Sequence, residues 1–133
     1  KFAHKYYDEI GLGIDFTARD IQEKAKENGH PWEQAKAFDG SAVIGEFFKK
    51  QDFEDLQALN FSLSKNSELV QEGNTSHMLW SIDALIAYVS QFFTLKKGDV
   101  LFTGTPAGVG RVKEDDVLKG VLEGKQAFEI KIK

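Results

Sequence analysis

Asp15 stands at the end of the apolar segment 10–16 and just before a predicted helix start. A carboxylate at such a place can cap the helix, or it can point from a rigid strand into a cleft, and capping is the more frequent role. Hard divalent ions such as Mg²⁺ need several oxygen ligands, which one aspartate does not provide. Asp20 and Asp39 are the other nearby acids, but Asp20 is better explained as the cap partner of the predicted helix. The residues alone therefore leave a metal site incomplete.

Lys36 lies between two aromatic residues, Trp32 and Phe38. An ammonium group there can stabilise a substrate enolate or carboxylate, although a surface lysine whose stem covers apolar neighbours is the more common explanation. Arg19 and Gln22 are three residues apart and share one face of the predicted helix. With Lys36 they could hold a carboxylate substrate, or they could be exposed helix residues.

The segment 103–110 (TGTPAGVG) is the most suggestive local feature. Glycines such as Gly104 allow backbone N–H groups to approach an anion, and Thr103 and Thr105 add hydroxyl donors. No Gly-Lys-Ser/Thr ending is present, so the segment is not a phosphate-binding P-loop. An anion-binding loop and a tight turn between strands both remain open.

Composition limits the possible functions of the 133 residues. That length suits one domain, and 41% hydrophobic with 29% charged residues is the balance of a globular domain rather than a disordered tail. A net charge of −4 argues against a nucleic-acid surface, which needs concentrated Lys and Arg. The absence of cysteine excludes disulfides and thiolate metal sites and is compatible with a cytoplasmic protein. No segment is apolar for long enough to predict a membrane helix.

Two helices are predicted from apolar spacing. The first begins at Thr17, with Asp20 three residues later in a capping-box-like arrangement, and ends before Gly29. The second covers residues 81–93, where apolar residues recur at helical spacing. Residues 32–45 are predicted to form a loop.

Strands are predicted from alternation and from short apolar runs. They are expected near residues 10–16, 59–64, 69–72, 100–103, 117–122 and 128–132. Short turns at residues 65–67 and 123–124 predict hairpins. The pattern favours the α+β class with a largely antiparallel or mixed sheet.

Several segments occur in an order that is familiar from one enzyme family. They are residues 13–22 (GIDFTARDIQ), 35–41 (AKAFDGS), 71–75 (QEGNT), 85–90, 94–100 and 103–110. Together they resemble the fumarylacetoacetate hydrolase family over nearly the whole chain. The resemblance is greatest to the branch of acylpyruvases, oxaloacetate tautomerases or decarboxylases, and hydroxyheptadienedioate isomerases. It implies a mixed, mainly antiparallel β-sheet roll with two main helices.

The resemblance also implies roles for individual residues. Asp15 matches a ligand of one divalent ion, Mg²⁺ or Mn²⁺, with Ca²⁺ as a further option. Lys36 matches the lysine that stabilises an enolate-like intermediate, and Arg19 and Gln22 match residues beside the substrate. Thr105 matches a threonine that binds the substrate carboxylate, with Thr103 and Gly104 next to it in the same loop.

Two features depart from the family pattern. The family's two glutamate metal ligands, and a lid whose His/Glu pair activates water in the hydrolytic members, both precede the matched region. We therefore expect residues 1–133 to be a single catalytic domain that lacks its amino-terminal part, with an exposed sheet edge or an open metal cleft. A smaller departure is Arg111, which stands where a proline is frequent.

The resemblance implies metal-dependent hydrolysis of a C–C bond in an acylpyruvate-type 2-oxo acid. One alternative is an isomerase, tautomerase or decarboxylase acting on oxaloacetate or a hydroxyheptadienedioate, the latter in aromatic catabolism. Another is a non-catalytic fragment that lacks the metal site. We expect a small 2-oxo-acid substrate, no nucleic-acid or membrane partner, and a homodimer through aromatic residues. These residues are Phe47, Phe48, Phe53, Trp80, Phe92 and Phe93.

Overall fold

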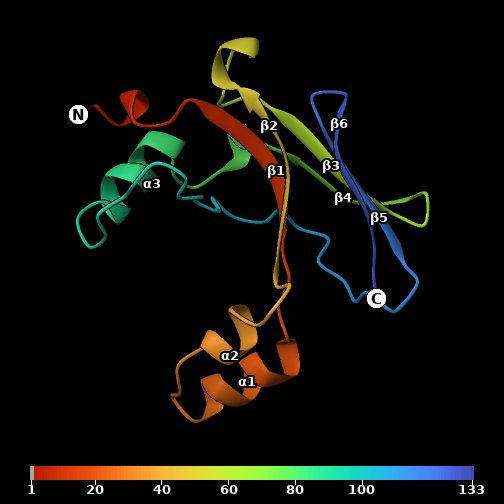
Figure 1. Ribbon diagram of the computed structural model, residues 1–133. Coiled ribbons are helices and arrows are strands. Elements are labelled where there is room, and N and C mark those ends of the chain that lie inside the picture. Colours follow the sequence, from red (N-terminus) through yellow and green to blue (C-terminus); the bar gives the residue numbers. More distant parts are fainter. Residues whose placement is uncertain (1) are drawn as a thin grey trace.

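The computed structural model describes residues 2–133 and contains two sheets and two helices of eight residues or more (Figure 1). One sheet has two strands and the other has four, and every strand pair among the described residues is antiparallel. The α+β class with mainly antiparallel sheets and two main helices is confirmed. Within residues 2–133, no helix has the length and apolar character needed to cross a membrane.

The four-stranded sheet is built from two tight hairpins. Its strands, in the spatial order β4-β3-β5-β6, are β3 (Asn60–Lys65), β4 (Glu68–Asn74), β5 (Val117–Leu122) and β6 (Lys125–Lys131). Both turns have two residues with positive φ: 51° and 70° at Asn66 and Ser67, and 47° and 74° at Glu123 and Gly124. Such turns follow the twist of the flanking strands and fix their register. Both predicted hairpins are confirmed, although β6 begins three residues earlier than residue 128, where its start was predicted.

The main core lies on one face of β5 and β6. Leu118, Leu122 and Phe128 are buried there, and Leu118 is only 1% exposed. Gly120 lies directly under the ring of Phe128, because a Cβ at this position would be 2.3 Å from the ring. A side chain larger than hydrogen at residue 120 would therefore displace the aromatic ring that closes the core.

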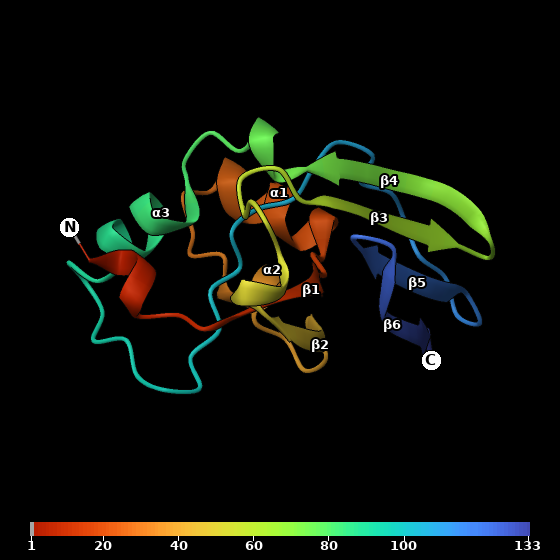
Figure 2. The same ribbon diagram turned by 90° about the horizontal axis from the view of Figure 1, so that it is seen from above.

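The two-stranded sheet packs against the edge of the larger sheet. It pairs β1 (Glu9–Asp15) with β2 (Ala42–Lys49), and β2 also packs against β6 (Figure 2). Gly45 permits this approach, since a Cβ there would lie 2.7 Å from the Leu12 carbonyl and 2.8 Å from that of Ala127. β2 occupies residues 42–45 of the segment 32–45 that was predicted to be a loop, so that prediction is wrong for these four residues.

Residues 100–103 do not form the predicted strand. The segment has no ladder partner, and its Phe102 ring instead packs across Gly13 of β1. A Cβ at Gly13 would lie 3.0 Å from that ring. The apolar run is therefore explained by packing over a glycine and not by pairing in a sheet.

A lobe of two short helices projects from the end of β1 (Figure 1). It contains α1 (Arg19–Glu27) and α2 (Glu33–Lys36), the latter also inside the predicted loop. The backbone N–H of Ala18 donates to the carbonyl of Ala35 at 3.0 Å, and the side chain of Ala35 is fully buried. Ala18 is the N-cap of α1 and makes no side-chain capping bond, so the predicted capping box with Thr17 and Asp20 is wrong.

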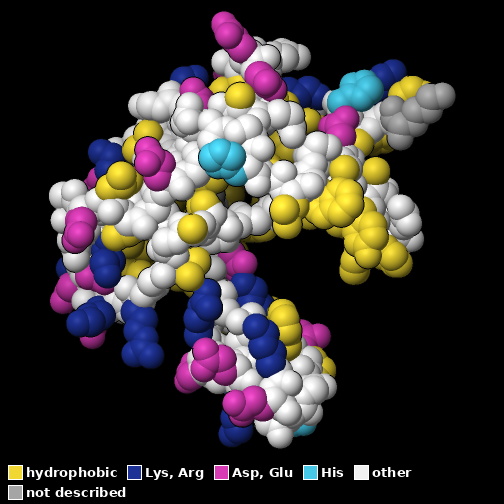
Figure 3. All heavy atoms as spheres, turned by 180° about the vertical axis from the view of Figure 1, so that it is seen from behind, with side chains coloured by type: hydrophobic (Ala, Val, Ile, Leu, Met, Phe, Trp, Pro, Cys, Tyr) yellow, Lys and Arg dark blue, Asp and Glu magenta, His cyan; other side chains and the backbone are white. Residues whose placement is uncertain are grey.

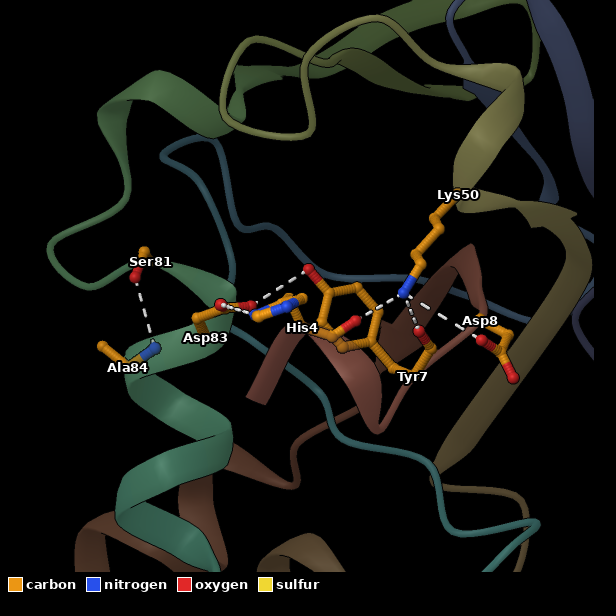
Figure 4. A network of polar contacts seen from close by, with 7 residues as sticks. All are labelled: His4, Tyr7, Asp8, Lys50, Ser81, Asp83 and Ala84. Carbon is orange, nitrogen blue, oxygen red and sulfur yellow. Dashed lines mark hydrogen bonds and ion pairs between the residues drawn. The ribbon is translucent and has the colours of Figure 1, made fainter. Parts of the chain in front are cut away.

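The third helix, α3 (Ile82–Val89), holds the amino-terminal segment (Figure 4). The Tyr7 hydroxyl donates to Asp83 of α3 at 3.2 Å, and His4 Nδ1 lies 3.8 Å from the other carboxylate oxygen. Lys50 directly follows β2, and its Nζ donates to the carbonyls of His4 and Tyr7, each at 2.5 Å. Burial, together with Asp83, raises the pKa of Tyr7 above its ordinary value. α3 ends at Val89, four residues before the predicted end of the helix.

Candidate active site

A large cleft separates the helical lobe from the four-stranded sheet. Its volume is about 980 Å³, which is at the upper end for a small-molecule site. In the space-filling view a hollow lies between the lobe and the sheets, with Lys and Arg side chains on both sides (Figure 3). We call residues 12–20, 22, 23 and 36 the lobe wall, and residues 61–63, 71, 104–106 and 109–112 the loop wall. Leu118 and Phe128 of the core also contribute to the cleft.

The lobe wall carries a compact polar cluster. Lys36, the last residue of α2, places its Nζ 2.5 Å from Oδ2 of Asp15 and 2.8 Å from the hydroxyl of Thr17. Asp15 is the last residue of β1, so the chain leaves the strand, forms the two helices and returns to the same point. Both charged side chains stay accessible from the cleft, with 31% of Lys36 and 38% of Asp15 exposed. The pair can therefore meet a ligand without rearrangement of the backbone.

These contacts bear on one of the roles considered for Asp15, that of a helix cap. Asp15 does not cap α1, whose N-cap residue is Ala18. Lys26, and not Lys36, lies over the Trp32 ring, with its Nζ 5.0 Å from the ring centroid. Lys36 is instead paired with a carboxylate at the edge of a cleft.

The glycine-rich loop is held against β4. Gly108 has φ +96°, and a Cβ on it would lie 2.5 Å from the carbonyl oxygen of Val70. The amide of Gln71 donates to the carbonyls of Pro106 and Ala107 at 3.3 and 3.4 Å. Glycine is therefore required at residue 108 both for its backbone conformation and for the close approach to the strand. The strand β4 therefore holds this loop beside the cleft.

Six of the seven predicted site residues line this one cleft. They are Asp15, Arg19, Gln22, Lys36, Gly104 and Thr105. Thr103 is not among the residues that line it. Sequence reasoning missed several polar contributors, among them Thr17, Gln71 and Arg111. Thr17 had been expected to cap a helix, whereas Gln71 and Arg111 lie within or directly beside segments already noted in the sequence.

The donor set of the chain does not by itself fit a divalent ion. Asp15 is the one carboxylate in the polar cluster, and Lys36 engages its Oδ2. Among residues 2–133 no three His, Asp or Glu side chains are arranged to hold a metal ion. Mg²⁺ and Mn²⁺ require more oxygen ligands than one monodentate carboxylate supplies. Asp15 can therefore contribute one ligand at most.

Comparison with known proteins identifies the family. Residues 3–131 match the family model described as fumarylacetoacetate (FAA) hydrolase C-terminal. The chain belongs to the fumarylacetoacetate hydrolase family. The resemblance stated from the segments around Asp15, Lys36 and the glycine-rich loop is thereby confirmed.

Relatives within the fumarylacetoacetate hydrolase family include enzymes named for oxaloacetate. The mitochondrial oxaloacetate tautomerase FAHD1 of Mus musculus is 43% identical over 131 residues, which cover 98% of this chain and 59% of the mouse protein. The oxaloacetate tautomerase YcgM of Escherichia coli is 48% identical over 115 residues, which cover 86% of this chain and 52% of the bacterial protein. The chain thus spans between half and three fifths of the length of these relatives.

A solved structure of the family shows the same fold. The fumarylpyruvate hydrolase of Pseudomonas aeruginosa, in complex with Mn²⁺ and pyruvate, superposes with a TM-score of 0.91 at 34% identity. The match covers 98% of this chain and 56% of the hydrolase. Oxaloacetate tautomerases are more similar in sequence to this chain than this hydrolase is. The predicted alternative, isomerisation or decarboxylation, is therefore better supported than the predicted C–C bond hydrolysis.

Proposed function

We propose that the complete protein interconverts the keto and enol forms of oxaloacetate or of a closely related 2-oxo acid. The observation that carries this proposal is the Lys36–Asp15 pair, which faces the glycine-rich loop across one cleft. The identities of 43% and 48% to two oxaloacetate tautomerases support the choice of substrate class. In this proposal residues 1–133 form part of a single catalytic domain.

Tautomerisation moves one proton and leaves the composition of the substrate unchanged. A proton leaves the carbon next to the oxo group, the C–H electron pair forms the C=C bond of an enolate, and a proton adds to the oxygen. Negative charge develops on that oxygen before it is protonated. The Lys36 ammonium is a fixed positive charge that stabilises the developing charge, because Asp15 and Thr17 already orient it.

The remaining cleft residues bind and orient the substrate. Thr105 supplies a hydroxyl for the substrate carboxylate, and Gly104 leaves the loop backbone open to an anion, since nothing lies within 4 Å of a Cβ placed there. Arg19 and Gln22 approach from the first turn of α1 on the opposite wall. Thr103 does not line the cleft and has no role in this proposal.

One divalent ion, Mg²⁺ or Mn²⁺, completes the proposed site, with Asp15 as one of its ligands. Oδ1 of Asp15 forms no hydrogen bond with another residue in 2–133, which leaves it available to a cation. Bound there, the ion would supply Lewis-acid polarisation of the substrate's oxo group. The Mn²⁺ present in the Pseudomonas hydrolase supports this assignment.

Hydrolysis of a C–C bond in an acylpyruvate is the second candidate function. The similarity to the Pseudomonas fumarylpyruvate hydrolase favours it. Both reactions pass through an enolate that Lys36 would stabilise, so the cluster on the lobe wall suits either. A third candidate, a non-catalytic unit without its metal site, would make Asp15 and Lys36 a structural ion pair.

We extend the proposal to the assembly and location of the protein. A homodimer would cover exposed aromatic side chains beyond α3, and the named relatives come from mitochondria and from a bacterium. A cytoplasmic location remains a proposal that cell fractionation would test.

Rates of the complete protein with three substrates test the function. The substrates are oxaloacetate, acetylpyruvate and a hydroxyheptadienedioate, each assayed with Mg²⁺ or Mn²⁺ and after chelation of the metal. We expect oxaloacetate tautomerisation to have the largest kcat/KM. Faster cleavage of acetylpyruvate would establish the hydrolase instead. Failure to turn over any of the three, with no metal bound, would establish the non-catalytic unit.

A further inference from the structure

Arg111 is the single charged side chain on the loop wall of the cleft, as far as residues 2–133 are concerned. The other residues of that wall are apolar, glycine or uncharged polar. All three carboxylates of the cleft, Asp15, Asp20 and Glu23, belong to the lobe wall. The two walls therefore differ in charge, and an anionic group is attracted to the loop wall at Arg111.

The guanidinium of Arg111 has no partner within residues 2–133. No carboxylate lies within ion-pair distance of it, and the polar contact made by this residue is through its backbone. Lys65 Nζ donates to the Arg111 carbonyl at 3.1 Å, which ties the base of the side chain to the end of β3. The result is a cation with a fixed backbone and a free, exposed head group beside the glycine-rich loop.

The two other cations of the cleft are in different situations. Lys36 on the lobe wall is already paired with Asp15. Arg19 shares the first turns of α1 with Asp20 and Glu23, whose charges weaken its attraction for an anion. Arg111 has no such acidic neighbour on its own wall. Of the three cations that line the cleft, Arg111 is therefore the one with neither an acidic partner nor an acidic neighbour on its wall.

We propose that Arg111 binds the distal carboxylate of a 2-oxo dicarboxylic acid whose oxo group lies at the Lys36–Asp15 pair, which makes Arg111 a specificity-determining residue. This inference rests on the proposed function and assigns recognition of the second carboxylate of its substrate to one residue of the loop wall. Arginine suits the task, because its planar guanidinium can donate two parallel hydrogen bonds to one carboxylate. A monocarboxylate of the same shape gains nothing from this residue.

The test compares a dicarboxylate with its monoester in the complete protein. kcat and KM are measured for oxaloacetate and for its 4-methyl ester with wild type, Arg111→Gln, Arg111→Lys and Lys113→Gln. Lys113 is the matched control because it lies two residues further along the same loop and does not line the cleft. We expect Arg111→Gln to raise KM for oxaloacetate by about 10- to 30-fold, with kcat and the ester kinetics nearly unchanged. Arg111→Lys should recover part of the loss, and Lys113→Gln should resemble wild type.

Two results would overturn the inference. One is an equal loss on oxaloacetate and on the ester, which would mean that Arg111 supports the loop and not the distal group. The other is no change in KM for either substrate.

Equilibrium binding separates failure of this inference from failure of the proposed function. Calorimetry of wild type and Arg111→Gln with 2-oxoglutarate and 2-oxopentanoate, which differ in the distal carboxylate, needs no turnover. If the enzyme is inactive but Arg111→Gln still weakens binding of 2-oxoglutarate alone, the proposed function fails and the subsite stands. If wild type does not prefer 2-oxoglutarate over 2-oxopentanoate, the subsite is refuted whatever the activity.

Discussion

The ammonium nitrogen of Lys36 lies 2.5 Å from a carboxylate oxygen of Asp15, although 21 residues separate the two along the chain. Backbone bonds at the base of the lobe make this contact possible, because Phe16 donates to Ser41 at 2.7 Å and Ala18 donates to Ala35 at 3.0 Å. The lobe thus returns the chain to the end of β1, where both charged groups face the cleft. A fold-imposed pair of this kind can orient a cation toward a substrate before the substrate arrives.

Removal of the Lys36 charge tests whether that cation acts in the reaction. In the complete protein, Lys36→Met keeps most of the stem and deletes the ammonium, so we expect kcat to fall by roughly 100- to 1000-fold. The melting temperature should hardly change, since a partly exposed ion pair contributes about 1 kcal/mol or less. Lys24→Met, on the exposed part of α1, is the control and should be active. Normal kcat in Lys36→Met would show that the pair is structural.

The fit of the glycine-rich loop against β4 is tested at Gly108. Gly108→Ala should destabilise the protein by about 1–3 kcal/mol, because alanine at φ +96° is strained and its Cβ meets the Val70 carbonyl. Gly110→Ala is the matched control, since nothing lies within 4 Å of a Cβ there. Thermal unfolding of the two variants gives the comparison. Equal melting temperatures would contradict the position assigned to this loop.

Asp116 makes the stability of the loop before β5 dependent on pH. Its oxygens accept from the Asn66 amide and from the Lys113 backbone N–H, each at 2.8 Å, and these bonds hold the pKa of Asp116 below its usual value of 3.8. As the pH falls below 3.8, Asp116 is protonated in the unfolded chain before it is protonated in the folded chain. The stabilising contribution of these bonds is therefore lost as the pH falls from 3.8 through the lowered pKa of the folded state. Asp116→Asn should therefore flatten this part of the acid-unfolding curve.

Glu114→Gln provides the control for that experiment, because Glu114 is an exposed acid in the same loop. Urea unfolding at several pH values between neutral and strongly acidic gives the required curves. Identical acid dependence of wild type and Asp116→Asn would show that these hydrogen bonds do not shift the titration of Asp116.

The predicted homodimer is testable at the exposed aromatic side chains that follow α3. Phe92 and Phe93 are 65% and 67% exposed, and together they form an apolar surface that the proposed second subunit would cover. The double variant Phe92→Ser/Phe93→Ser should shift the complete protein toward monomer in sedimentation velocity. Leu69→Ser, at an exposed apolar residue on β4, should leave the dimer intact. A wild type that sediments as a monomer would refute the prediction.

Not all of the aromatic residues expected at an interface are free to form one. Phe48 and Phe53 pack edge to face with ring centroids 6.3 Å apart, and Lys125 lies over both rings. They are partly buried within the chain itself. Composition alone indicated a surplus of aromatic residues, but which of them remain exposed depends on tertiary packing.

Local sequence patterns predicted the hairpins and the helix α1, but they did not predict β2 or α2. The two hairpin turns have short polar or glycine-containing sequences between alternating strands, and such signals are local. β2 and α2 carry no comparable signal. Apolar and polar residues do not alternate cleanly in the sequence of β2, because the strand is largely exposed and packs through Gly45. α2 has only four residues, and its form depends on contact with α1.

The candidate site was predicted from the sequence as far as a family motif could indicate it. The motif included Asp15 and Lys36, but the contact between them depends on how the lobe folds back. Thr17 was assigned to a cap because Ser and Thr before a helix usually have that role. In the structure its hydroxyl accepts from Lys36 instead. Arg111 was noted as a departure from the motif, and its place on the loop wall became apparent only from the cleft.

The most direct test of the central claim is the rate of oxaloacetate tautomerisation by Asp15→Asn as Mg²⁺ is titrated, with a thermal melt of the same samples. Asparagine keeps the size of the side chain and an acceptor for Lys36 but removes the negative charge that attracts a hard cation. We predict that the complete variant protein needs at least about 10-fold more Mg²⁺ for half-maximal rate. Its maximal rate should be lower and its melting temperature nearly unchanged. Full activity with unaltered Mg²⁺ dependence would contradict the account, because Asp15 would then only hold Lys36 in place.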